Sequence, residues 1–242
     1  MTAIKIENLV KEYRTVRAVD GLSLSIEEGE LFSLLGVNGA GKTTTIKMLS
    51  CLTAPTSGDA YVFGNSITKN ATRVKPIIAV SPQETAIARG LTVRENLELI
   101  CGVHGFSKQK REEKIAELTR LLSLDEMLDR RAGKLSGGWQ RRLSIAMALI
   151  SEPRVLFLDE PTLGLDVIAR SELWDMIRSL KGEVTIILTT HYMEEAEALS
   201  DRIAIMKDGR LIECDTAAAI KEKAGEDSFE RAFVKIVKES GR

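Results

Sequence analysis

Short apolar runs alternate with amphipathic segments along most of the chain, a pattern typical of an α/β fold. We expect strands at residues 4–10, 22–26, 31–35, 77–80, 155–158 and 185–190, and short hairpins around 61–63 and across 202–206 and 210–214. Two of these runs, 155–158 and 185–190, are typical of strands buried on both faces. The helical pattern at residues 167–180 between them completes a β-α-β unit. The core is therefore predicted to be a largely parallel sheet.

Between about residues 84 and 150 the pattern changes to that of helices. Apolar positions recur at steps of three and four residues over 92–103, 108–122 and 136–150, as in amphipathic helices. We therefore expect an inserted helical lobe at about residues 84–150. The core would comprise about residues 1–83 and 151–215, including a helix at 44–52, and a charged helical tail would follow at about 216–242. These parts are expected to form a single domain over residues 1–242.

Charge and composition exclude some classes of function. Lys and Arg number 34 against 35 Asp and Glu, so the net charge is −1 and no basic field points to nucleic acid. A cluster of basic residues in the lobe is interpreted as a solvated face: Arg130, Arg131, Lys134, Arg141 and Arg142. The odd number of cysteines, without metal-ligand spacing, fits a reducing cytoplasm. No apolar run approaches the ~18 residues of a membrane span, so a membrane role would come through a partner.

A glycine-rich segment follows the apolar run at residues 31–35. It reads Gly36, Val37, Asn38, Gly39, Ala40, Gly41, Lys42, Thr43 and Thr44, and its first eight residues fit G-x-x-x-x-G-K-[ST] between a strand and a helix. Such a loop cups a triphosphate with backbone N–H groups at the positive end of the helix. Lys42 would reach the β and γ phosphates, and the Thr43 hydroxyl would bind Mg²⁺. The alternative is a glycine-rich turn without a ligand.

Two acids, Asp159 and Glu160, end the buried run at residues 155–158. Ligands of open α/β sheets bind at the carboxyl ends of the strands. Asp159 would hold the water shell of Mg²⁺, and the carboxylate of Glu160 would polarise a water for in-line attack on the γ phosphate. Because Pro161 follows, the alternative is a strand-end turn that caps the next segment. The upstream phosphate loop favours the catalytic interpretation.

His191 directly follows the buried run at residues 185–190. A lone histidine is more often a packing or capping residue, but the strand-end position beside the two acids favours a role at the γ phosphate. There an imidazole would hold Glu160 and the attacking water in line. The other histidine, His104, is flanked by two glycines in the lobe and is interpreted as structural.

Two further residues are candidates on position alone. Gln83 lies where the sheet gives way to the lobe, so its amide would reach Mg²⁺ or the attacking water, and its junction position suits a hinge that senses nucleotide. Tyr13 follows the first strand and would stack on an adenine ring; a half-buried tyrosine at a strand end would look the same.

The segment Leu135, Ser136, Gly137 and Gly138 begins a long helix. Ser136 is a favourable N-cap residue, and the two glycines leave the first N–H groups of the helix open. This is a second candidate anion site. The alternative is an ordinary helix cap.

Taken in order, these motifs resemble the nucleotide-binding subunit of an ATP-binding cassette (ABC) transporter over nearly all of residues 1–215. The Leu-Ser-Gly-Gly sequence separates this family from other phosphate-loop ATPases. The resemblance implies the P-loop ABC-cassette fold, with a RecA-like, mainly parallel core, an N-terminal antiparallel β subdomain and the inserted lobe. Segments 43–49, 91–97, 191–197 and 227–230 resemble the bacterial drug-resistance and efflux branch.

The resemblance implies ATP and Mg²⁺ as ligands, with Thr43, Gln83 and Asp159 at the metal. Two cassettes would pack head to tail, so that Ser136, Gly137 and Gly138 grip the γ phosphate bound to the partner. Here a homodimer is expected at the cytoplasmic face of the membrane, joined to multi-helix transmembrane permease subunits on separate chains. The expected activity is ATP hydrolysis that drives a transporter, with export of drug-like, lipid, polysaccharide or ion substrates favoured over import.

Two departures and two rival functions accompany this interpretation. The fifth signature position is Trp139 rather than glutamine, which puts a contact from this residue in doubt, and Val37 stands where many members carry proline. One rival is a soluble cassette ATPase that acts on ribosomes, DNA or cluster assembly. The other is a regulatory adaptor that binds ATP without turnover; the presence of Asp159, Glu160 and His191 argues against it.

Overall fold

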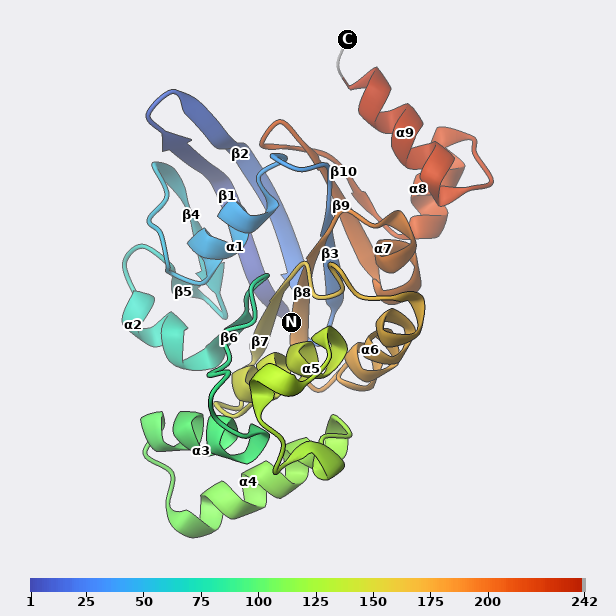
Figure 1. Cartoon of the computed structure of the whole chain (residues 1–242). Helices are drawn as coiled ribbons and strands as arrows, with labels where there is room; N and C mark the ends of the chain where they lie inside the picture. The colour runs from blue at the N-terminus through green and yellow to red at the C-terminus, as the bar shows by residue number, and fades with distance from the viewer. Residues whose placement is uncertain (241–242) are drawn as a thin grey trace.

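The computed structural model describes residues 1–240 and contains two β-sheets with helices around and below them (Figure 1). The smaller sheet is antiparallel, with the strand order β2-β1-β4-β5. Its strands are β1 (Thr2–Tyr13), β2 (Val16–Glu27), β4 (Ser57–Val62) and β5 (Asn65–Ser66). This sheet confirms the antiparallel β subdomain that the resemblance implied.

The larger sheet has the order β10-β9-β3-β8-β7-β6. Its strands are β3 (Leu31–Leu35), β6 (Ile78–Ser81), β7 (Val155–Asp159), β8 (Thr185–Thr190), β9 (Arg202–Lys207) and β10 (Arg210–Asp215). All neighbouring pairs are parallel except β9 and β10, which form the expected hairpin. Every residue of β3, β7 and β8 is buried, which confirms the prediction of a largely parallel, buried core.

Helices follow the strands or form the lobe. They are α1 (Lys42–Leu49), α2 (Ala71–Val74), α3 (Val93–Val103), α4 (Lys108–Leu121), α5 (Gly137–Leu149), α6 (Val167–Ser179), α7 (Met193–Leu199), α8 (Ala217–Ala224) and α9 (Phe229–Glu239), with short 3₁₀ turns at Lys75–Ile77, Asp125–Met127 and Ala132–Lys134. Helices α3 and α4 lie below the sheets, with α5 between them and the larger sheet (Figure 1). Thr92 and Glu95 form a reciprocal capping box at the start of α3. The division at residues 83 and 151 stays a sequence-based prediction.

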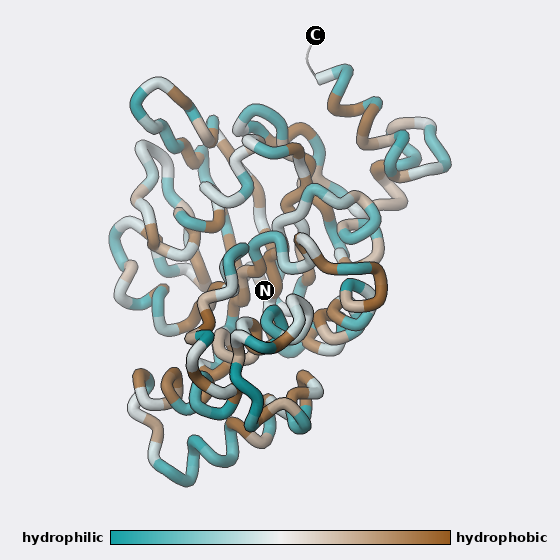
Figure 2. The backbone as a smooth tube through the Cα atoms, in the orientation of Figure 1, coloured by the Kyte–Doolittle hydropathy of each residue, from teal (hydrophilic) through white to brown (hydrophobic). Residues whose placement is uncertain are grey.

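The two faces of the larger sheet belong to different cores because side chains alternate along each strand. Leu156 and Leu158 pack with the lobe helices and α6, whereas Val155 and Phe157 pack with α1 and the antiparallel sheet. A third cluster joins α8 and α9 to Leu35 and β9. Hydrophobic colour accordingly follows the central strands, while much of the outer loops is hydrophilic (Figure 2).

The first hairpin is longer than the sequence indicated. Strands β1 and β2 each contain twelve residues, whereas the apolar pattern predicted only residues 4–10 and 22–26. The outer ends of both strands are largely exposed, and several register shifts interrupt their pairing, so the period-two pattern is lost there. No helix within residues 1–240 combines the length and apolar character needed to cross a bilayer.

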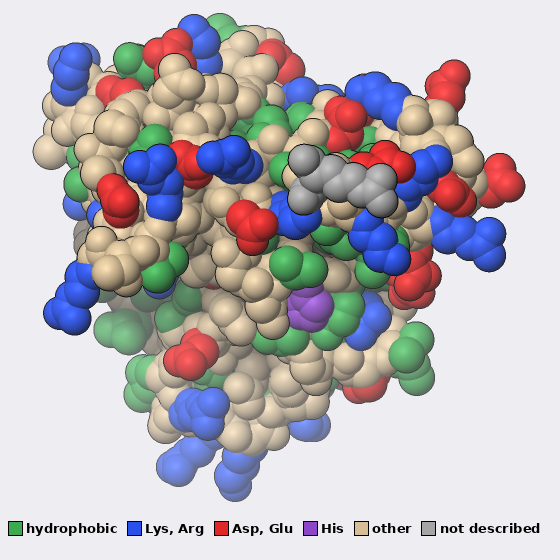
Figure 3. All heavy atoms as spheres, turned by 90° about the horizontal axis from the view of Figure 1, so that it is seen from above, with side chains coloured by type: hydrophobic (Ala, Val, Ile, Leu, Met, Phe, Trp, Pro, Cys, Tyr) green, Lys and Arg blue, Asp and Glu red, His purple; other side chains and the backbone are tan. Residues whose placement is uncertain are grey.

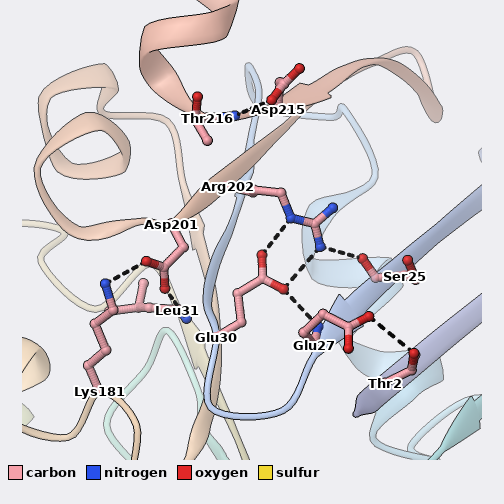
Figure 4. Close-up of polar contacts among 10 residues, drawn as sticks. All are labelled: Thr2, Ser25, Glu27, Glu30, Leu31, Lys181, Asp201, Arg202, Asp215 and Thr216. Atoms are coloured by element: carbon pink, nitrogen blue, oxygen red, sulfur yellow. Dashed lines mark hydrogen bonds and ion pairs between the residues drawn. The ribbon is translucent and has the colours of Figure 1, made fainter.

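An ion pair joins the two sheets at the end of β3 farthest from the glycine-rich loop (Figure 4). Arg202 donates to both carboxylate oxygens of Glu30, at 2.8 and 3.0 Å, and to the carbonyl of Ser25 at 2.7 Å. The Glu27 N–H donates to the same Glu30 carboxylate at 2.7 Å. These contacts connect β9 to β2 through the residue that precedes β3.

Candidate functional site

The glycine-rich loop connects β3 to α1 and turns through backbone conformations that favour glycine. Gly41, the N-cap of α1, has φ 100°, and a Cβ at this position would overlap the carbonyl of Ala18. Lys42 is 5% exposed, and its Nζ donates to the carbonyls of Gly36 at 2.7 Å and Val37 at 3.3 Å. The lysine side chain therefore folds back under the loop.

The first turn of α1 offers free donors to an anion. The first helical hydrogen bond runs from Thr45 N–H to the Gly41 carbonyl, 2.9 Å away, so the N–H groups of Lys42, Thr43 and Thr44 precede the intrahelical pattern. Gly41 supplies no side-chain cap for them. These donors, the helix dipole and the nearby ammonium group fit a phosphate group well.

Asp159 ends β7 beside the first turn of α1. It is 5% exposed, and its Oδ1 accepts hydrogen bonds from the hydroxyls of Thr43, at 3.1 Å, and Thr189, at 2.5 Å. The sheet register places Asp159 opposite Thr189. A hydroxyl beside a carboxylate supplies the hard oxygen ligands that Mg²⁺ prefers, so this pair fits the predicted metal site.

Glu160 is held in an unusual backbone conformation. Its φ of 50° lies in the left-handed region, which non-glycine residues seldom adopt outside turns and functional sites. Its N–H donates to the carbonyl and the hydroxyl of Thr189 at 3.1 and 3.0 Å. Its carboxylate, in a residue only 7% exposed, lies 3.5 Å from Lys42 Nζ and 2.5 Å from His191 Nδ1.

The electrostatics of this cluster follow from burial and the close carboxylates. Burial lowers the pKa of the Lys42 ammonium from its usual value, while Glu160 and then Asp159 act in the opposite direction. Because a carboxylate only accepts hydrogen bonds, the Nδ1 of His191 is the donor to Glu160. Glu160 is thus positioned from two sides, by a lysine and by a histidine.

His191 is itself packed by aromatic and cationic groups. The ring of Tyr192 lies 4.1 Å from the ring of His191, centroid to centroid. The guanidinium of Arg170, on α6, lies 4.7 Å from the centroid of the Tyr192 ring, within the range of a cation–π contact. The histidine orientation therefore depends on the start of α6 as well as on β8.

A hollow of ≈ 710 Å³ brings most of the predicted residues together. The predicted site residues that line it are Asn38, Gly39, Ala40, Gly41, Lys42, Thr43, Thr44, Gln83, Glu160 and His191. Gly36 and Val37 lie behind it as acceptors for Lys42, and Asp159 lies behind Thr43. Val16, Arg17 and Ala18 form its wall on the β2 side.

Tyr13 lies outside this hollow. It is 44% exposed, pairs with Val16 across the first hairpin, and has the ammonium of Lys11 4.9 Å from its ring centroid. Stacking of Tyr13 on adenine stays a prediction. Val16, which is 61% exposed, lines the hollow instead.

The predicted second anion site faces elsewhere. Ser136 is the exposed N-cap residue of α5, and its side chain makes no capping hydrogen bond. This differs from the ordinary cap that was the alternative. Gly137 lines a separate hollow of ≈ 540 Å³, together with Leu165 and Gln83. The Leu-Ser-Gly-Gly segment thus lies away from the hollow of its own phosphate loop.

Two features of the site escaped sequence reasoning. Arg141 and Arg142 were assigned to a solvated face, but they are only 5% and 8% exposed, because they pack between α5 and its neighbours; Arg130, Arg131 and Lys134 are exposed as expected. Thr189 was also not predicted, although its hydroxyl donates to Asp159 and accepts from the N–H of Glu160. Its signal was weak: a threonine in a buried strand is common, and only the register with β7 shows its role.

A strand–loop–helix phosphate site, an acid pair at the end of the adjacent strand, and an open helix N-terminus on an inserted lobe define a P-loop nucleotide-binding cassette. Comparison with known proteins agrees. The family model described as "ABC transporter" matches residues 19–163. The chain belongs to the ABC transporter family and is an ATPase of that family.

Characterised relatives share most of the chain. The daunorubicin/doxorubicin resistance ATP-binding protein DrrA of Streptomyces peucetius is 42% identical over 92% of this chain and 68% of its own length. The phospholipid-transporting ATPase ABCA3 of Homo sapiens is 42% identical over 93% of this chain. The chain spans only 13% of the length of ABCA3.

Solved structures share the fold. One, described as the ATP-binding subunit of an ABC transporter, matches with a TM-score of 0.85 and 27% identity over 98% of this chain and 100% of its own. The ATP-binding cassette MJ0796, solved as a dimer in a post-hydrolysis state with ADP and Pi, matches with a TM-score of 0.78 and 26% identity over 88% of this chain and 98% of its own. The expected ABC-cassette fold is thus confirmed.

Proposed function

We propose that this chain hydrolyses MgATP at the hollow of its phosphate loop, with Glu160 as the general base. The observation that carries the proposal is the position of the Glu160 carboxylate, between Lys42 and His191 at the rim of the hollow. Glu160 would accept the proton of the attacking water, and His191 would keep the carboxylate aimed at that water.

The remaining groups of the site would bind and orient the triphosphate. The first N–H groups of α1 and the ammonium of Lys42 would hold the β and γ phosphates. We assign Thr43, Asp159 and Gln83 to Mg²⁺, which would neutralise part of the phosphate charge. Asp159 and Thr43 already meet at 3.1 Å, and Gln83 lines the same hollow.

We further propose that two copies pack head to tail, so that Ser136, Gly137 and Gly138 of one copy contact the γ phosphate held by the other. Exposed apolar side chains that follow Asp166, the N-cap residue of α6, support this interface: Val167 and Ile168 are 78% and 73% exposed. Asp166 itself caps α6 by accepting from Ala169 N–H at 2.9 Å. The ATP-binding cassette MJ0796, which shares this fold, was solved as a dimer with ADP and Pi.

The proposed partners outside the dimer are membrane-spanning permease subunits on separate chains, so that the cassette lies on the cytoplasmic face of the membrane. The helical lobe offers a docking surface, because Leu99 and Val103 on α3 are 50% and 75% exposed. Acidic and basic side chains intermingle on the face seen in Figure 3, as on a surface not built for nucleic acid. The relatives named for drug resistance and phospholipid transport favour export of a drug-like or lipid substrate.

The decisive experiment is purification of the tagged chain from detergent-solubilised membranes of its native cell. We expect a multi-helix membrane protein to co-purify in comparable amount, and ATP hydrolysis by the complex to require Mg²⁺. The Glu160→Gln variant is the matched control, since it should recover the same partner without turnover. Recovery of only soluble partners, with the chain absent from membranes, would refute the transporter assignment and favour an ATPase that acts in the cytoplasm.

A further inference from the structure

Residues 81–83, where β6 leads into the lobe, are held against one face of α5. The Oγ atoms of Ser81 and Ser144 lie 3.0 Å apart. Arg141 donates from Nη1 to the Pro82 carbonyl and from Nη2 to the Gln83 carbonyl, each at 2.6 Å. Arg141 and Ser144 are three positions apart, so they lie on the same side of the helix. The side chain of Ser81 and the backbone carbonyls of Pro82 and Gln83 are therefore attached to α5.

Arg141 is an unusual residue for a purely structural contact. It is 5% exposed, and within residues 1–240 no carboxylate lies at ion-pair distance from it. Burial lowers the pKa of its guanidinium, and the more distant carboxylates of Asp159 and Glu195 act in the opposite direction. A buried cation without a close counter-ion is unfavourable for stability. The planar guanidinium, however, spans two adjacent carbonyls in a way that a lysine ammonium does not.

Gln83, whose carbonyl Arg141 holds, lies between two hollows of the molecule. Gln83 lines both the hollow of the phosphate loop and the hollow that Gly137 lines. Gln83 thus borders the hollow of this chain's own phosphate loop, while its carbonyl is held by the helix whose N-cap residue is Ser136. The neighbouring Arg142 instead pairs with Glu172 on α6, at 2.7 Å.

We propose that Arg141 is a positioning residue that makes the backbone of Gln83 move with α5. When the N-terminus of α5 closes over the nucleotide bound to a second cassette, the guanidinium would carry Gln83 toward Thr43 and Asp159. One arginine would thereby connect the two nucleotide sites that each chain touches. This inference rests on the proposed ATP hydrolysis and head-to-tail pairing.

The test is a double-mutant cycle on kcat between Arg141→Met and Gln83→Ala, with Arg142→Met as the matched control. We expect Arg141→Met to lower kcat by roughly 10- to 100-fold, as misplacement of a positioning group does, with the KM for ATP and the Kd for ADP changed less than about twofold. In the Gln83→Ala background, Arg141→Met should cost little more. Arg142→Met should instead act independently of Gln83→Ala, because its partner lies on another helix.

Circular dichroism establishes first that each variant is folded. If Arg141→Met is unfolded, Arg141→Lys replaces it. A lysine ammonium would hold the two carbonyls less well than the two donors of the guanidinium do, so kcat should again fall, and the loss should again couple to Gln83→Ala. Additive effects of the Arg141 variant and Gln83→Ala, in a wild type that hydrolyses MgATP, would overturn this inference alone. A folded wild type without Mg²⁺-dependent hydrolysis would overturn the proposed function and this inference together.

Discussion

The ion pair between Arg202 and Glu30 allows a quantitative test of how the two sheets are joined (Figure 4). Arg202→Met retains an unbranched apolar stem but removes three hydrogen bonds, two to Glu30 and one to the Ser25 carbonyl. The Glu30 carboxylate, in a residue 8% exposed, would keep only the donor from Glu27 N–H. The variant therefore leaves a buried charge with one partner.

The expected loss follows from burial. Removing one partner of a fully buried ion pair costs about 3–5 kcal/mol. The side chain of Arg202 is 31% exposed, so solvent screens part of the interaction, and we expect a loss of about 2–3 kcal/mol. For a domain of this size, about 2–4 °C of melting temperature corresponds to each kcal/mol, so Arg202→Met should melt roughly 5–10 °C below the wild type.

Thermal unfolding followed by circular dichroism at neutral pH measures this difference. The double variant Arg202→Met with Glu30→Met should recover much of the loss, because replacing both partners of a buried pair with apolar groups is often neutral. ATP affinity should be unchanged in both, since the pair lies at the end of β3 opposite the phosphate loop. A single variant that melts with the wild type, or a double variant less stable than the single, would refute the reasoning.

Three further predictions concern the nucleotide site and the helix behind it. Glu160→Gln should bind ATP normally and trap the closed dimer, with kcat reduced at least 100-fold or so; steady hydrolysis by this variant would remove Glu160 as the base. Lys42→Ala should lose ATP binding in titration calorimetry, and unchanged affinity would contradict the phosphate-loop assignment. Burial raises the pKa of the fully buried Glu195, opposed by hydrogen bonds that include the one from Trp174. The folded chain then holds this proton more tightly than the unfolded chain, so the stability it contributes is complete below the usual pKa of 4.5 and is lost as pH rises toward the folded value. Glu195→Gln keeps an acceptor for Trp174 and lacks this titration. The melting temperature of Glu195→Gln relative to that of the wild type should therefore increase between about pH 5 and about pH 8. A difference that stays constant across that range would contradict the buried, protonated carboxyl.

The buried strands could be predicted closely because burial on both faces requires a continuous local run of apolar residues. The predicted segments at β3 and β8 coincide with Leu31–Leu35 and Thr185–Thr190. The outer part of the first hairpin is held instead by backbone pairing between exposed strands. Exposed residues there carry no alternation, so the sequence indicated only the inner half of each strand.

The same distinction applies to the site. Glu160 and His191 directly follow the adjacent parallel strands β7 and β8, so their proximity could be inferred from strand-end positions alone. Thr189 and Arg141 could not be found that way, because each has a common local explanation, a β-branched residue in a strand and a basic residue in a charged cluster. Their roles depend on what lies across the fold: Thr189 contacts Asp159 and the N–H of Glu160, and Arg141 contacts the Gln83 loop.

These contacts also change where the chain is expected to bend. The junction position of Gln83 suggested a hinge at that residue, yet Arg141 and Ser144 attach residues 81–83 to α5. Beyond Gln83, residues 84–91 run through bends, turns and irregular backbone before α3 begins. A bend confined to that segment would keep Gln83, α5 and β6 in one body, so Gln83 would not approach Thr43. Because Ser81 pairs with Leu158 in the core sheet while Arg141 holds the carbonyls of Pro82 and Gln83, motion of Gln83 with α5 requires the chain to bend between Ser81 and Pro82.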